Sequence, residues 1–150
     1  MPFSPSLIAA VSIQLGCQLF KVFYYSAKER RFSIRWFFSA GGVPSAHTAF
    51  VSALAVSVGL YRGFASEIFA VALVFAVIVV YDILRVRAAV QAHSNILRLL
   101  LAERAARAEA GKEEPPALPS EVGHTVAEVV IGFAVGAGGA AGLFLLMGRL

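Results

Sequence analysis

Two short stretches of the sequence carry groups suited to acid–base and phosphate chemistry. The first, GGVPSAHTAF at residues 41–50, places His47 two residues after Ser45 and behind a glycine pair. The second, GHTVAEVVIG at residues 123–132, places His124 four residues before Glu128. Histidine can act as a nucleophile or as a general acid, and positions i and i+4 share one face of a helix. Both stretches stand at the head of an apolar segment, which is an unusual place for such groups.

The composition is that of a membrane protein. Of 150 residues, 59% are hydrophobic and 15% charged, and the mean hydropathy of +0.77 exceeds what a soluble core needs. A hydrocarbon layer about 30 Å thick requires roughly 20 apolar helical residues. Four segments come close to that length, namely residues 6–27, 44–60, 64–84 and 126–147. We therefore expect an all-α, polytopic membrane bundle with four transmembrane helices.

The region between the third and fourth segments differs from the spans. Residues 85–110 repeat apolar side chains every three or four positions among arginines, which predicts one amphipathic helix at the cytoplasmic or interfacial side. A lid or a dimer contact is the alternative use of this helix. The proline-containing stretch AGKEEPPALPSE at about residues 110–121 is typical of a flexible connection. We expect one domain over residues 1–150.

Positive charge predicts the orientation. Most of the 13 Lys and Arg residues lie at residues 28–35 and 85–112, so the positive-inside rule puts these connections in the cytoplasm and both termini outside. No Lys or Arg precedes the first apolar stretch and no small-residue cleavage site follows it, so we expect that helix to be retained. The single cysteine excludes an intrachain disulfide, and no motif indicates nucleic-acid binding, a metal-spaced cysteine cluster or a P-loop.

Alternating helices would bring four helix ends to the cytoplasmic face, and each of these ends carries polar groups. Two are helix N-termini, whose unpaired N–H groups and positive dipole ends favour a phosphate-like anion. Ionisable groups at membrane depth are costly and usually functional. The candidate phosphate-binding residues are Lys21, Gly42, Ser45 and Arg87, with Asp82 and Arg85 in support. Two histidines can then divide the roles of nucleophile and acid in the cleavage of a phosphate monoester.

Each of these residues also has a structural interpretation. Ser45 can be a helix cap after Pro44, and Thr125 with Glu128 matches a capping box. Lys21 can extend to the interface, and the arginines of YDILRVR at residues 81–87 can be anchors paired with Asp82. The glycines of the last segment are typical of close helix packing; they are Gly132, Gly136, Gly138 and Gly142.

The stretches GGVPSAHTAF, YDILRVR and GHTVAEVVIG resemble, in order and spacing, the signatures of the divergent branch of the type 2 phosphatidic acid phosphatase and vanadium haloperoxidase superfamily. This resemblance implies that His124 is the nucleophile that forms a phosphohistidine and that His47 is the general acid. Glu128 stands where the superfamily has the aspartate that orients the nucleophile. The resemblance also matches Lys21 and Ser45 to phosphate-binding positions.

The sequence departs from the superfamily at several positions. The superfamily usually has an arginine six residues before the nucleophile, but this chain has Leu118 there. Arg87 is our candidate for the missing phosphate-binding arginine. Arg85, which stands where glycine is usual, is the other candidate for that role. Superfamily enzymes commonly have six spanning helices, and a homodimer is one way to complete a shorter fold.

The leading hypothesis is a phosphatase of the plasma (inner) membrane that hydrolyses a lipid phosphate monoester at the cytoplasmic face without metal or other cofactor. The substrate and the bilayer are the expected partners, and no nucleic acid is expected. The first alternative is a metal-dependent membrane hydrolase, in which His47, His124, Asp82 and Glu128 ligate a divalent ion. The second is a non-catalytic protein that binds lipid phosphates.

Overall fold

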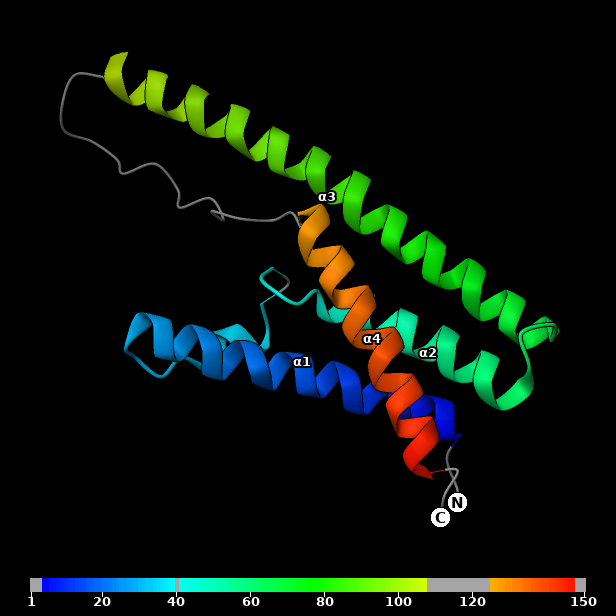
Figure 1. Ribbon diagram of the computed structural model, residues 1–150. Coiled ribbons are helices and arrows are strands. Elements are labelled where there is room, and N and C mark those ends of the chain that lie inside the picture. Colours follow the sequence, from blue (N-terminus) through cyan, green and yellow to red (C-terminus); the bar gives the residue numbers. More distant parts are fainter. Residues whose placement is uncertain (1–3, 40, 108–124, 148–150) are drawn as a thin grey trace.

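The protein is all-helical in the part of the chain that the structure describes. The computed structural model describes residues 4–39, 41–107 and 125–147. Its elements in chain order are α1 (Pro5–Glu29), the short 3-10 helix η1 (Ile34–Phe37), α2 (Ala46–Arg62), α3 (Glu67–Arg107) and α4 (Val126–Met147). The chain direction alternates, so that the end of α1 and the starts of α2 and α4 lie on one side (Figure 1). This alternation is the arrangement that the sequence predicts.

Helix α2 is the centre of the bundle and contacts α1, α3 and α4. Small side chains make these contacts possible, because they let helix backbones approach closely. Ala53 of α2 is buried between Ala10 of α1 and Ala140 of α4. On another face, Val51, Ala55 and Val58 of α2 pack with two alanines of α3, Ala72 and Ala76. The polar residues that α2 buries, chiefly serines and a threonine, are also small.

The packing of α4 on α2 depends on glycine at two positions four residues apart. A Cβ atom at Gly132 would lie 2.5 Å from the carbonyl oxygen of Ser45, and one at Gly136 would overlap Ser52 Oγ and the Ala49 carbonyl oxygen. The expected role of glycine in packing is therefore confirmed at these positions. It is wrong for Gly138 and Gly142, where a Cβ atom would meet open space.

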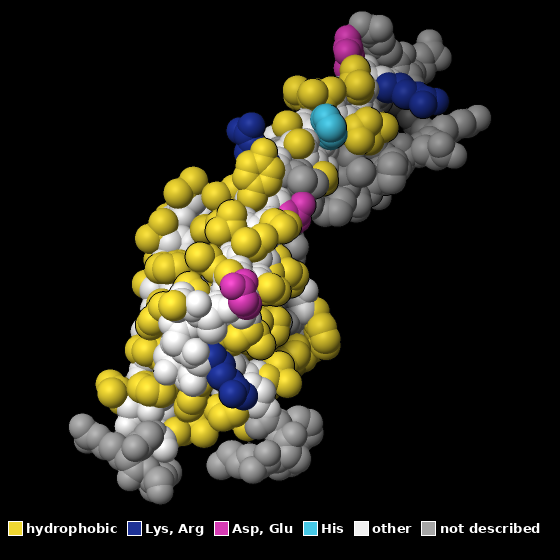
Figure 2. Space-filling view, turned by 90° about the vertical axis from the view of Figure 1, so that its right-hand side faces the viewer, with side chains coloured by type: hydrophobic (Ala, Val, Ile, Leu, Met, Phe, Trp, Pro, Cys, Tyr) yellow, Lys and Arg dark blue, Asp and Glu magenta, His cyan; other side chains and the backbone are white. Residues whose placement is uncertain are grey.

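Three of the described helices are long and apolar enough to cross a membrane: Pro5–Glu29, Glu67–Arg85 and Val126–Met147. Their outer surfaces are hydrophobic, and Figure 2 shows such side chains covering most of one face of the bundle, with few charged groups among them. The fourth expected span, α2, is not confirmed as a span. It has 17 residues and is therefore about 26 Å long, less than a hydrocarbon layer of about 30 Å.

The expected boundary near Arg85 is wrong. Residues 64–84 and 85–110 were each predicted to form a separate helix, but one helix of 41 residues, α3, runs from Glu67 to Arg107. No glycine or proline occurs within it, so nothing in its backbone ends the first helix where the charges begin. The second half extends beyond the other helices (Figure 1). The predicted connection at about residues 110–121 lies outside the described residues.

Replacing Gly136 with alanine should destabilise the bundle, because the new methyl group overlaps the backbone of α2. Overpacking of this kind typically costs about 1–3 kcal/mol. Thermal unfolding in detergent measures the effect, and Gly138→Ala is the matched control because its methyl group meets open space. Equal unfolding temperatures for the two variants would show that α4 does not pack on α2 through Gly136.

Candidate functional site

Lys21 is a buried charge at the junction of α1, α2 and α4. Its side chain is 1% exposed, and Nζ donates a hydrogen bond to the Gly41 carbonyl oxygen at 3.0 Å. Among the described residues this carbonyl is the one hydrogen-bond acceptor of the ammonium, which has three N–H donors. A buried ammonium is costly unless it is paired. The site therefore retains donors and positive charge that suit an anion, and the alternative in which Lys21 extends to the interface does not match its burial.

The loop before α2 is held by Tyr25, which lies four residues after Lys21 on α1. The Tyr25 hydroxyl accepts a hydrogen bond from Val43 N at 3.2 Å, and the Tyr25 ring stacks on Trp36 with 4.1 Å between ring centroids. Gly42 has a φ of 89°, and a Cβ atom there would lie 2.9 Å from the Tyr25 hydroxyl oxygen. Glycine is thus required at position 42 both by conformation and by close approach.

Ser45 joins the starts of α2 and α4. Its backbone N–H donates to the Glu128 carbonyl oxygen at 3.2 Å, which fixes the two helix N-termini beside each other. Its fully buried hydroxyl caps α2 by accepting from Thr48 N at 3.4 Å and lies 3.0 Å from Thr48 Oγ1. The cap interpretation of Ser45 is therefore observed, and a role of its hydroxyl in phosphate binding stays a prediction.

Glu128 closes the capping box that its spacing predicts. Thr125 N donates to Glu128 Oε2 at 3.2 Å, and Glu128 N donates to Thr125 Oγ1 at 3.3 Å. The carboxylate also interacts electrostatically with the Lys21 ammonium. Glu128 thus contributes to the start of α4 and to the charge balance at Lys21, while its role in orienting His124 stays a prediction.

The structure describes His47 but not His124. His47 lies in the first turn of α2, two residues after Ser45, and is half-buried. His124 lies outside the described residues, although it directly precedes Thr125 in the chain. Thr125 begins the capping box of α4.

The described residues of the YDILRVR stretch lie on α3, and the supporting roles of Asp82 and Arg85 stay predictions. Asp82 and Arg85 are both exposed on α3, and the Arg85 guanidinium lies over the Tyr81 ring, 6.0 Å from its centroid. The side chain of Arg87 is not among those that the structure describes. Among the residues described, no three His, Cys, Asp or Glu side chains come together as metal ligands; His124, which the metal-dependent alternative also requires, lies outside the described residues.

Sequence reasoning did not identify Tyr25 or Thr48 as parts of the site. For Tyr25 one signal existed, since a residue four positions after Lys21 lies on the same helix face. Thr48 occupies the third position after the Ser45 cap, where a cap hydroxyl finds its N–H donor.

Comparison with known proteins bears on the same region. The profile of the Divergent PAP2 family matches residues 4–138, a range that contains all three polar stretches. The chain belongs to this family. A Bacillus subtilis (strain 168) protein of the curated set, named Uncharacterized membrane protein YuiD, is 29% identical over 134 residues, covering 84% of this chain and 85% of its own. No solved structure matches the chain at a significant level.

Membership of the family agrees with an all-helical membrane protein whose polar groups gather at helix ends. The match begins before Lys21 and ends beyond Glu128, so the described part of the junction lies wholly inside it. The name of the relative does not state a reaction.

Replacing Lys21 with methionine should abolish anion binding at the junction, because methionine keeps the volume and removes the charge. A ligand that binds only the folded state stabilises that state by about 2.7 kcal/mol when the ligand concentration is 100 times its Kd. Thermal unfolding with added orthovanadate or inorganic phosphate measures this, and we expect stabilisation of the parent protein. Lys28→Met, an exposed change in the last turn of the same helix, is the control and should keep the response. An unchanged vanadate response in Lys21→Met would rule out the site at Lys21.

Proposed function

We propose that the protein is a membrane phosphatase that hydrolyses a lipid phosphate monoester through a phosphohistidine intermediate. The observation that carries this proposal is the buried Lys21 ammonium, held by a single loop carbonyl where the N-termini of α2 and α4 meet. A buried cation beside two positive helix ends favours a doubly charged phosphate group. A lipid substrate would keep its tail in the bilayer and bring its headgroup to these helix ends.

The reaction follows from the roles of the two histidines. In the first step a neutral imidazole nitrogen of His124 bonds to phosphorus, the bond from phosphorus to the lipid oxygen breaks, and His47 gives its proton to the leaving alcohol. In the second step water attacks the phosphohistidine, His47 takes a proton from that water, and the phosphorus–nitrogen bond breaks to release phosphate. Lys21 and the helix N-termini offset the charge on the phosphoryl oxygens in both transition states.

The remaining residues have supporting roles in this proposal. Arg87 supplies the second counter-charge in place of the arginine that Leu118 replaces, and the exposed position of Arg85 over Tyr81 favours Arg87 over Arg85. Glu128 orients His124 while it holds the start of α4. Asp82 and Arg85, which are exposed on α3, have no part in the chemical step that we propose.

A second candidate function is lipid-phosphate binding without turnover. It is favoured by one observation, the absence of the usual arginine six residues before His124. Such a protein would keep the buried Lys21 and bind headgroups, but would release no phosphate. EDTA distinguishes a metal-dependent hydrolase from both of these functions. Such an enzyme would lose its activity in EDTA and recover it when metal is added.

Replacing either histidine with alanine should reduce phosphate release from lipid phosphates by about 10²–10⁴-fold, since each supplies a proton-transfer or nucleophilic role. The assay is phosphate release by purified protein from a panel of lipid phosphate monoesters, with EDTA present throughout. Orthovanadate should inhibit the parent protein. Turnover by His124→Ala near the parent rate would refute the mechanism, and binding of the panel without any release would select the second function.

Glu128→Gln separates the two roles of Glu128. Glutamine also closes a capping box, so the unfolding temperature should stay near that of the parent. Phosphate release should nevertheless fall about tenfold or more, because the amide cannot hold an imidazolium as a carboxylate does. If activity and stability fall together, Glu128 acts only as a cap.

The proposal places the site at the cytoplasmic face of the plasma (inner) membrane, with all four helices α1 to α4 crossing the bilayer. The support is the positive charge of the α1–α2 connection, where Lys28, Arg30 and Arg31 follow one another closely. The alternating chain direction puts the α2–α3 turn on the opposite side.

This topology predicts the labelling of two single cysteines in a Cys17→Ser background. Phe32 and Ala65 are both exposed, the first near η1 and the second in the α2–α3 turn. A membrane-impermeant maleimide should label Ala65→Cys in intact cells and Phe32→Cys only in inverted membrane vesicles. Labelling of Phe32→Cys in intact cells would contradict the orientation, and labelling of both positions from one side would exclude a spanning α2.

A further inference from the structure

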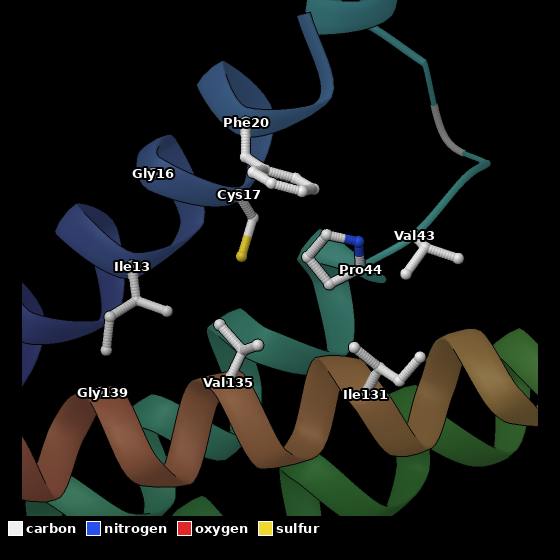
Figure 3. Close-up of a pocket in the computed structure, with 9 residues that line it drawn as sticks. All are labelled: Ile13, Gly16, Cys17, Phe20, Val43, Pro44, Ile131, Val135 and Gly139. Carbon is white, nitrogen blue, oxygen red and sulfur yellow. The ribbon is translucent and has the colours of Figure 1, made fainter. Parts of the chain in front are cut away.

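An apolar groove runs between α1 and α4 on the outside of the bundle. Its volume is about 430 Å³, within the usual range for ligand sites. In Figure 3 the labelled side chains from α1, the loop before α2 and α4 converge on a shared space; the lining residues are Ile13, Gly16, Cys17, Phe20, Val43, Pro44, Ile131, Val135 and Gly139. None of these side chains is charged, so the groove does not suit a polar or soluble ligand.

Three residues that line the groove are close in the chain to residues of the polar site. Cys17 lies one helical turn before Lys21 on α1. Pro44 is bonded to Ser45, which caps α2, and Ile131 lies three residues after Glu128 on α4. One end of the groove is therefore lined by residues that neighbour the polar site along the chain, and the groove continues along α1 and α4 towards Ile13 and Gly139.

The size of the groove limits its occupant. From Ile13 to Phe20 it follows α1 for about 10 Å. This length is most of one bilayer leaflet, which is about half of a 30 Å hydrocarbon layer. A single hydrocarbon chain fits this length and the uncharged lining of the groove.

We propose that this groove holds one hydrocarbon chain of the lipid phosphate substrate while the phosphate group binds at Lys21. This inference rests on the proposed function. The charged head of such an amphiphile matches the Lys21 cation, and its extended apolar chain matches the uncharged groove. A second chain of a two-chain lipid stays in the bilayer.

Gly16 is the position at which the groove can be filled without disturbing the fold. A Cβ atom at Gly16 meets nothing within 4 Å, although Gly16 lines the groove. At Gly139, in contrast, a Cβ atom would lie 3.0 Å from Ile13 Cδ1. A leucine at position 16 would therefore occupy space otherwise available to the lipid chain. Gly138 is the matched control, because it also has open space around it but does not line the groove.

The test compares the full-length parent, Gly16→Leu and Gly138→Leu in mixed micelles, with long-chain lipid phosphates and a short, water-soluble alkyl phosphate as substrates. Gly16→Leu should lower kcat/KM for the long-chain substrates about tenfold or more, as expected when two or more CH₂ groups lose their burial. It should change kcat/KM for the short substrate less than about twofold, and Gly138→Leu should change neither. An equal loss on long and short substrates, or no loss on either, would overturn the proposal.

A binding measurement keeps the test independent of turnover. Non-hydrolysable alkyl phosphonates of increasing length should raise the unfolding temperature of the parent progressively, and this dependence on length should disappear in Gly16→Leu. If the parent releases no phosphate but shows this dependence, phosphatase activity fails while the groove assignment stands. If phosphonates of all lengths stabilise the parent equally, the groove does not hold the chain. A bilayer lipid that filled the groove only as packing would likewise give no dependence on ligand length.

Discussion

The burial of one ammonium group constrains this end of the bundle. A charge that is 1% exposed in an apolar helix needs polar partners, and the Gly41 carbonyl is the hydrogen-bond acceptor of Lys21 among the described residues. The carbonyl reaches Lys21 because the following glycine takes a positive φ against Tyr25. The same loop leads into Ser45, whose N–H binds the first turn of α4. Lys21, the loop and both helix starts thus depend on one another.

The polar junction and the apolar groove together describe an amphiphilic ligand. Small residues bring α4 against α2, and this packing sets the two helix N-termini side by side. Between α1 and α4 the packing leaves the groove, whose lining includes Cys17, one helical turn before Lys21. The same placement of α4 therefore provides both parts of the proposed site, the positive end for a phosphate and the uncharged wall for a chain.

Local sequence patterns predicted the features that depend on local physics. The apolar lengths located α1, the first half of α3 and α4, and residue spacing located the Ser45 cap and the capping box of Glu128. The continuity of α3 could have been inferred from its lack of glycine and proline, but the change from apolar to charged residues suggested a boundary instead. The burial of Lys21, its bond to Gly41 and the groove depend on contacts between distant segments, which a single sequence does not specify. Only the structure distinguishes Gly138 and Gly142, which have open space around them, from the glycines of the α2–α4 interface.

An experimental structure of the protein with bound orthovanadate tests the central claim most directly. Vanadate resembles a phosphate group in transfer, so the account predicts density bonded to an imidazole nitrogen of His124, with Lys21 Nζ and an imidazole nitrogen of His47 within hydrogen-bond distance of its oxygens. Vanadate bound elsewhere, or the two imidazoles too far apart to contact one vanadate even across a subunit boundary, would contradict it.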